Sequence, residues 1–154
     1  MRSEELKTRI EHLVDTRSVR FGAWIYRRTD GRLLHLWHRR ALILTATGRR
    51  SGLPRSVIVQ FFPDGQDMIV VAANSGLPTH PGWYFNLKAH PQARVEVEGR
   101  TLEVRAEELL PEEAAAFWPR VLDTAPDYAR YPRRTTRQIP LLRLIPLGGS
   151  GNGT

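Results

Sequence analysis

Residues 41–62 read ALILTATGRRSGLPRSVIVQFF, and this stretch decides the fold. Apolar residues dominate its two ends, whereas glycine and arginine dominate its middle. The pattern predicts two strands joined by a turn, with the strands over Ala41 to Thr47 and Ser56 to Phe62. Strands separated by so few residues pair antiparallel, so the stretch predicts a hairpin within a sheet.

The turn between these two strands is strongly basic. Gly48 and Gly52 give its backbone freedom, while Arg49, Arg50 and Arg55 crowd their positive charges into one place. Mutual repulsion of this kind favours the binding of an anion. The turn lacks the glycine and lysine spacing of a Walker loop, so it is not a nucleotide-binding P-loop of that kind. A solvated hairpin turn remains the alternative interpretation.

The remaining sequence predicts one α+β domain over residues 1–147. Its N-terminal segment, 1–40, is expected to be helical, and residues 148–154 form a disordered tail. Further strands are predicted at 68–73, 94–98, 101–106 and 139–147, and helices at 3–14, 19–28, 83–89 and 111–123. A polar loop with two tyrosines is expected before the last strand. About six strands, mostly antiparallel, suit a small closed or partly split barrel, which removes exposed sheet edges.

The composition narrows the classes of function. The chain has 154 residues, no cysteine and a formal charge of +7, which comes almost entirely from arginine. Disulfides, thiolate zinc sites and cysteine nucleophiles are excluded. No apolar run approaches the ~18 residues of a membrane span, and no secretion signal is visible, so we expect a cytoplasmic protein. The charge indicates an anionic partner, such as a phosphorylated or carboxylated small molecule, a lipid headgroup or a nucleic acid.

Two later segments carry further candidate residues. AANSGLPTHPGWYFNLKAHP, residues 72–91, runs from a glycine loop into a helix whose Trp83 either stacks on a planar ring or belongs to the core. APDYARYPRRTTRQIP, residues 125–140, places Tyr128 and Tyr131 on one face of a helical turn, where they either close over a pocket or pack on the surface. No metal site is expected, because the pair His35 and His38 lacks a third ligand.

These three segments, in this order, resemble the deazaflavin-dependent nitroreductase family, whose members use coenzyme F420. The resemblance covers residues 25–147. It implies a split β-barrel like that of flavin-binding reductases, with N-terminal helices and a helix before the last strand. It also implies an oxidoreductase that transfers a hydride from reduced F420 to a small organic acceptor: a quinone, a nitro compound or an enone.

The resemblance assigns roles to residues of this chain. The turn would hold the phosphate and glutamate tail of the coenzyme, the end of the third strand would border its deazaflavin ring, and the following helix would line the ring and its linker. The implied coenzyme-binding residues are Arg49, Arg50, Ser51, Arg55, Val71, Ala72, Ala73, Gly82, Trp83 and Asn86. The implied catalytic residues, which face the acceptor, are Tyr128 and Tyr131.

Three positions depart from the family pattern. Asn74 stands where relatives often carry a lysine, and Ala125 and Gln60 stand where tyrosines occur. These changes bear on the range of acceptors more than on the choice of coenzyme.

Competing interpretations predict different partners. A split barrel can also hold FMN, whose phosphate would suit the same arginines. A nucleic-acid-binding protein is less favoured, because no recognition motif or periodic arginine stripe appears. The amphipathic N-terminal helix suggests peripheral contact with the cytoplasmic face of a membrane. The oligomeric state is open between a monomer and a homodimer.

Overall fold

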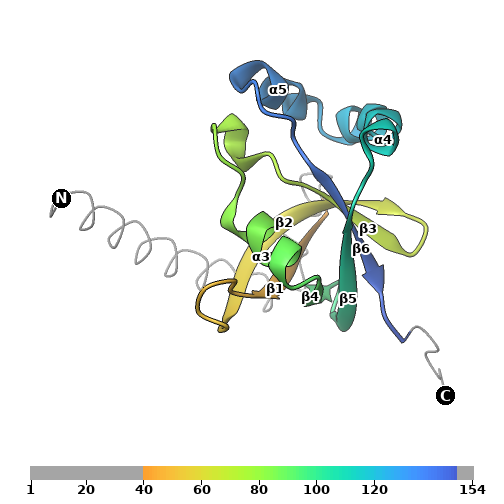
Figure 1. Cartoon of the computed structure of the whole chain (residues 1–154). Coiled ribbons are helices and arrows are strands. Elements are labelled where there is room, and N and C mark those ends of the chain that lie inside the picture. The colour runs from red at the N-terminus through yellow and green to blue at the C-terminus, as the bar shows by residue number, and fades with distance from the viewer. Residues whose placement is uncertain (1–39, 149–154) are drawn as a thin grey trace, which may run out of the picture.

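In a computed structural model of the chain, which describes residues 40–148, six antiparallel strands form a closed barrel (Figure 1). The predicted N-terminal helices, with His35 and His38, and residues 149–154 of the tail lie outside the described residues. The strands are β1 (Ala41–Thr47), β2 (Pro54–Asp64), β3 (Asp67–Val71), β4 (Gln92–Val97), β5 (Arg100–Glu108) and β6 (Leu141–Pro146). Every predicted strand is present, with its ends shifted by a few residues.

The barrel closes because β6, the last strand in sequence, pairs with both β3 and β5. The order around the barrel is β1-β2-β3-β6-β5-β4, and β1 also pairs with β4. Each strand therefore has two neighbours around the barrel, although β2 pairs with β1 over residues 54–60 and with β3 only over residues 61–64. In this order β2 lies opposite β5.

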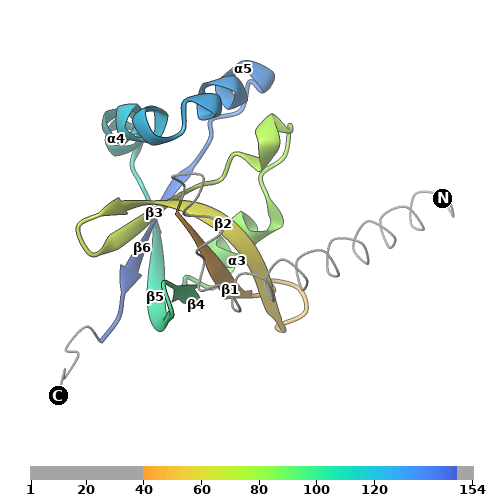
Figure 2. The same cartoon turned by 180° about the vertical axis from the view of Figure 1, so that it is seen from behind.

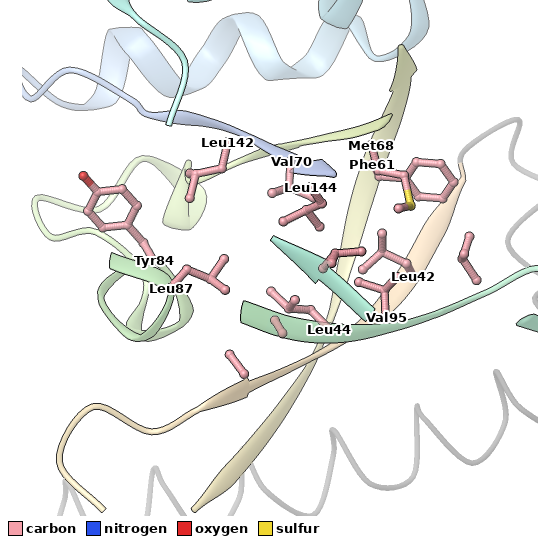
Figure 3. Close-up of a cluster of buried hydrophobic side chains, with 14 of the residues drawn as sticks. Leu42, Leu44, Phe61, Met68, Val70, Tyr84, Leu87, Val95, Leu142 and Leu144 are labelled. Atoms are coloured by element: carbon pink, nitrogen blue, oxygen red, sulfur yellow. The ribbon is translucent and has the colours of Figure 1, made fainter. Parts of the chain in front are cut away.

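The interior of the barrel is an apolar core of buried strand residues (Figure 3). Leu44 of β1, Val95 of β4 and Leu144 of β6 are all 0% exposed. Helix α3 (Gly82–Ala89) adds Tyr84 and Leu87 to this core. Burying one such leucine contributes about 1.5–3 kcal/mol, so α3 is held firmly on the barrel.

The outer face of β2, β3 and β6 packs under helix α4 (Pro111–Thr124). Phe117 and Val121 of α4 are buried against Phe62 and Ile69 of the sheet. The helix begins where predicted, at Pro111 and two glutamates that suit the positive end of its dipole. On this buried side Ala114 also packs on the cluster, whereas Ala116 is exposed.

The polar loop predicted after α4 is two short helices instead. They are η2 (Pro126–Arg130) and α5 (Tyr131–Arg134), and each has a proline in its first turn, a position that favours helix initiation. Together with α4 they lie at the end of the barrel away from the β1–β2 turn, as both views show (Figures 1 and 2). No helix within residues 40–148 is long and apolar enough to cross a membrane.

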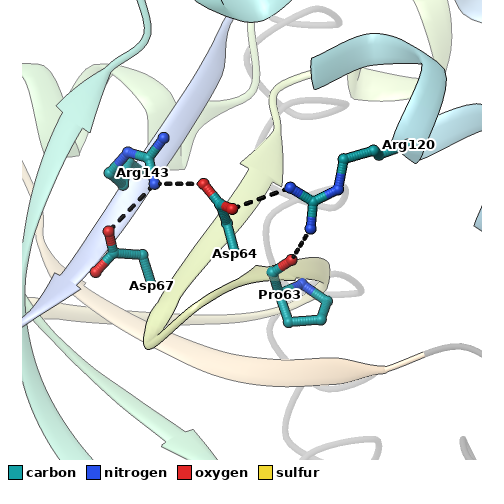
Figure 4. A network of polar contacts seen from close by, with 5 residues as sticks. All are labelled: Pro63, Asp64, Asp67, Arg120 and Arg143. Atoms are coloured by element: carbon teal, nitrogen blue, oxygen red, sulfur yellow. Dashed lines mark hydrogen bonds and ion pairs between the residues drawn. The ribbon is translucent and has the colours of Figure 1, made fainter. Parts of the chain in front are cut away.

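An ion-pair network ties the β2–β3 hairpin to β6 and α4 (Figure 4). Asp64 accepts hydrogen bonds from Arg143 at 2.8 Å and from Arg120 at 2.9 Å. Arg143 also donates to Asp67 at 3.1 Å, and Arg120 donates to the Pro63 carbonyl at 2.9 Å. The hydrogen bonds from Arg143 and Arg120 hold the pKa of the Asp64 carboxyl below its usual value.

We expect Asp64→Asn to lower the free energy of unfolding by about 1 kcal/mol at pH 7, because the network is partly exposed to solvent. Because the pKa of the Asp64 carboxyl is lower in the folded protein than in the unfolded one, its ionisation stabilises the fold at a pH above the unfolded-state value. This stabilisation is lost as the pH falls through the folded-state value. Urea unfolding of the wild type and of Asp64→Asn should therefore show that the difference in their free energies of unfolding disappears well below pH ~3.9. A gap of equal size in acid would contradict this role for Asp64.

Candidate functional site

The turn between β1 and β2 is a tight backbone loop closed by its own hydrogen bonds. The Gly48 amide donates to the Leu53 carbonyl at 2.8 Å, and the Gly52 amide donates to the Gly48 carbonyl at 2.8 Å. Gly52 has φ +68°, which favours glycine, and a Cβ on Gly48 would lie 2.6 Å from Ser51 Oγ, so a side chain there would displace the Ser51 hydroxyl. Ser51 Oγ accepts a hydrogen bond from the Leu53 amide at 3.2 Å, which leaves its own proton available.

The three arginines of this turn have no carboxylate partner within residues 40–148. Arg49, Arg50 and Arg55 are all exposed. Most other described arginines are engaged, as the pairs of Arg40 with Glu98 and Arg94 with Glu103 illustrate. An unneutralised cluster of guanidinium groups on a fixed loop is suited to bind phosphate or carboxylate groups.

The turn is joined directly to helix α3. The Arg49 amide donates to Asn86 Oδ1 at 3.0 Å, and the Arg49 guanidinium lies 4.7 Å from the centre of the Phe85 ring. The sequence named Arg49 and Asn86 as site residues, and the structure brings them together. Gly82 is exposed at the start of α3, whereas Trp83 is half-buried against the barrel core.

The segment after β3 is held by one side chain, Arg137. Its guanidinium donates to the carbonyls of Ala72 at 3.2 Å, Ala73 at 2.5 Å and Leu77 at 2.9 Å. It also contacts Nδ1 of His80 at 2.8 Å. Arg137 therefore fixes the main chain that the sequence assigned to the border of the coenzyme ring.

The contact with Arg137 also sets the protonation of His80. A guanidinium has no lone pair to offer, so Nδ1 accepts the hydrogen bond and the ring carries its proton on Nε2. Burial and the charge of Arg137 lower the pKa of His80. The ring packs on Tyr84 and Phe85 of α3, with centroid distances of 4.6 and 5.8 Å.

Tyr84 is a fixed hydrogen-bond donor in this region. Its hydroxyl donates to Glu108 at 2.7 Å, and Lys88 contacts the other oxygen of that carboxylate at 3.2 Å. Burial and the bond to Glu108 raise the pKa of Tyr84 to about 12, so its phenol stays protonated at neutral pH.

The two predicted catalytic tyrosines lie side by side between η2 and α5. Their ring centroids are 5.0 Å apart, edge to face, and the Tyr128 ring also meets Phe62 of β2 at 5.6 Å. The Tyr128 hydroxyl donates to Gln60 Oε1 at 3.0 Å. Gln60 therefore contacts a predicted site residue, at one of the positions where the sequence departs from the family pattern.

The other two departures have different surroundings. The Asn74 side chain donates to the Thr79 carbonyl of its own loop at 2.9 Å. Ala125 is 0% exposed within the cluster under α4, against which Tyr128 also packs.

The candidate residues form a band along one side of the barrel. In both views the β1–β2 turn lies at one end, α3 and the segment after β3 follow, and α5 lies at the other end (Figures 1 and 2). Such a band fits an elongated ligand with a charged tail at the turn and a flat group near the tyrosines. Sequence reasoning missed Arg137, because nothing in RRTTRQ distinguishes it from Arg133 and Arg134.

Comparison with known proteins identifies the family. The profile of the F420H(2)-dependent quinone reductase family matches residues 18–146. An F420H(2)-dependent quinone reductase of Mycobacterium tuberculosis is 34% identical over 140 residues, which cover 88% of this chain and 94% of that protein.

Two solved structures share the fold and much of the sequence. An F420-H2 dependent reductase has 34% identity and a TM-score of 0.63, covering 68% of this chain and 93% of that one. A domain-swapped dimer has 29% identity and a TM-score of 0.64, covering 94% of this chain and 99% of that one. The split-barrel fold and the resemblance to F420-dependent reductases are thereby confirmed.

Proposed function

Because the chain belongs to the F420H(2)-dependent quinone reductase family, we propose that it transfers a hydride from reduced coenzyme F420 to a small quinone. The observation that carries this proposal is the arginine turn, which is rigid, exposed and lacks carboxylate partners within residues 40–148. It lies at one end of a band of residues that ends at paired tyrosines. This order of charge and aromatic groups matches a ligand with an anionic tail and a planar redox ring.

The donor groups of the turn fit the coenzyme tail. Arg49, Arg50 and Arg55 supply guanidinium groups for the phosphate and the glutamate carboxylates, and Ser51 adds a hydroxyl proton. The link from the Arg49 amide to Asn86 fixes the turn against α3, so the tail and the linker would meet a preformed surface.

The remaining site residues would orient the ring and exclude water. Val71, Ala72 and Ala73 offer a small, largely buried main-chain wall, and Gly82 allows close approach at the start of α3. Trp83 supports this wall from the core. When bound, the coenzyme supplies the hydride, so the protein needs no nucleophile or metal for this chemistry.

The tyrosines would lie over the acceptor. The Tyr128 hydroxyl is directed to Gln60, which leaves Tyr131 or solvent as the source of the proton that completes the reduction. This assigns Tyr128 a positioning role beside the acceptor and keeps Tyr131 as the candidate proton donor.

Coenzyme binding and turnover test the function directly. Titrating the protein with F420 and with FMN should give tight binding of F420 alone, because only its tail needs all the arginines. Mixing the protein with reduced F420 and a panel of quinones and nitroaromatics, without oxygen, should oxidise the coenzyme fastest with quinones. Failure to bind F420 at low salt would refute the proposed function.

Two finer expectations concern partners. Contact with a membrane through the predicted N-terminal helix concerns residues that the structure does not describe and stays a prediction, tested by sedimentation with anionic liposomes at low salt. The domain-swapped dimer among the similar structures favours a homodimer over a monomer, and light scattering of the pure protein would measure this.

A further inference from the structure

One guanidinium joins the start and the end of the segment that connects β3 to α3. Arg137 donates to the carbonyls of Ala72 and Ala73, where this segment leaves β3. It also donates to the Leu77 carbonyl in the middle of the segment and meets Nδ1 of His80 near its end. The order of the whole segment therefore depends on where this guanidinium lies.

Of these four acceptors, only His80 titrates near neutral pH. The carbonyls accept hydrogen bonds at every pH, whereas Nδ1 accepts one only while the imidazole is neutral. A proton on Nδ1 would face the Arg137 guanidinium across the 2.8 Å that separates the two nitrogens. A hydrogen bond would then be replaced by the repulsion of two cations, which is strong at contact in a partly buried setting.

The elements packed on the His80 ring do little to accept its positive charge. Tyr84 and Phe85 of α3 lie against the ring, with centroid distances of 4.6 and 5.8 Å. Glu108 of β5 acts on the ring through its charge alone, because its two oxygens are engaged by the Tyr84 hydroxyl and by Lys88. Burial and the neighbouring guanidinium outweigh this attraction, so the pKa of His80 is lowered.

We propose that neutral His80 is a positioning residue of the candidate site, which fixes the Arg137 guanidinium. Protonation of His80 releases this guanidinium from the carbonyls of Ala72 and Ala73, and the main-chain wall that would border the coenzyme ring loosens. The inference rests on the proposed function and adds a control of coenzyme binding by pH.

Proton binding and coenzyme binding therefore oppose each other. Because the pKa of His80 lies below the usual value for histidine, the segment is held at neutral pH, and the affinity for F420 is full above pH ~6.5. The affinity falls as the pH is lowered through the pKa of His80 in the free protein. By the same linkage, bound coenzyme should lower the pKa of His80 further.

The variant His80→Asn separates the hydrogen bond from the charge. The asparagine Oδ1 can accept from Arg137 in place of Nδ1, but it takes up no proton in this pH range. In calorimetric titrations with oxidised F420, both proteins should bind alike at pH ~7.5, and at pH ~5 the wild type should bind about fivefold or more weakly than His80→Asn. Protonation of the coenzyme itself affects both proteins equally and cancels in this ratio.

The matched control is His90→Asn. His90 is exposed and directly follows α3, so this variant should keep the pH dependence of the wild type. If F420 affinity changes with pH equally in the wild type, His80→Asn and His90→Asn, the role of His80 is overturned.

Hydrogen exchange tests the release without the coenzyme. The amides of Gly76 and Leu77 donate to carbonyls of their own segment, at 2.9 and 3.0 Å. Their protection, corrected for the pH dependence of intrinsic exchange, should fall at pH ~5 in the wild type and hold in His80→Asn. Protection that does not depend on pH in the wild type would refute the release.

The outcomes separate this inference from the proposed function. If the wild type does not bind F420 at neutral pH, the proposed function fails and the positioning role of His80 fails with it, even where exchange shows the release. If F420 binds and the segment loosens in acid while the wild type and His80→Asn keep equal affinities, only the positioning role is refuted.

Discussion

Replacing Arg49 and Arg50 together by alanine is expected to weaken F420 binding by about 3 kcal/mol, roughly a hundredfold in Kd. Each guanidinium would make charge-assisted hydrogen bonds to the phosphate or the carboxylates of the tail, and both are exposed, so the lower end of the usual range applies. The loss should shrink as salt is added. Fluorescence titration of the pure protein at several ionic strengths measures it.

The control must remove the same charge elsewhere. Arg100 and Arg105 lie on β5, opposite β2 in the barrel order, and both are exposed. The double variant Arg100→Ala/Arg105→Ala should bind F420 like the wild type. Equal losses in the two double variants would mean that net charge, rather than the turn, attracts the coenzyme.

The barrel was predictable because its strands are short apolar runs between turn residues, and some of these runs alternate in hydrophobicity. Leu42 and Leu44 point into the core as the pattern in residues 41–47 requires, and the same regularity marks Val95 and Val97. The sequence indicated a helical turn at Tyr128 and Tyr131, but the extent of the helices over residues 126–134 was not evident, because polar residues and prolines equally suit a loop. Packing against the outer face of β2, through Phe62 and Tyr128, is what orders it.

The candidate site was predictable as a set of residues, but its connections were not. Arg49 and Asn86 were both named, yet their hydrogen bond joins positions 37 residues apart that no local pattern relates. The Gln60 side chain likewise accepts a hydrogen bond from a tyrosine 68 residues away. Such contacts are set by barrel closure, which a reading of local periodicity does not determine.

Arg137→Ala is expected to destabilise the fold and impair the site together. The carbonyls of Ala72 and Ala73 would lose a charged donor in a mostly buried setting, and the Leu77 carbonyl would lose its bond as well. We expect about 3 kcal/mol less stability, which corresponds to a melting temperature lower by roughly 10 °C. Differential scanning fluorimetry measures this, and F420 affinity should fall in parallel because the ring wall loosens.

The matched control is Arg134→Ala. Arg134 is an exposed arginine three residues away, and among residues 40–148 its guanidinium donates a hydrogen bond only to the Ser75 carbonyl, at 3.4 Å. Its removal should change neither the melting temperature nor F420 affinity appreciably. Arg137→Lys should resemble Arg137→Ala more than wild type, because one ammonium group cannot reproduce a planar fork that serves four acceptors.

His80 reports whether Arg137 acts as this geometry requires. In the wild type, the nitrogen chemical shifts of the imidazole should show a neutral ring protonated at Nε2, since Nδ1 faces the guanidinium. Burial and the charge of Arg137 both lower the pKa of His80. Arg137→Ala should therefore raise the pKa of His80, and burial should still hold this pKa below that of an exposed histidine. An unchanged imidazole spectrum together with an unchanged melting temperature would show that Arg137 does not hold this segment. If the segment loosens while F420 affinity stays the same, the carbonyls of Ala72 and Ala73 do not border the coenzyme ring.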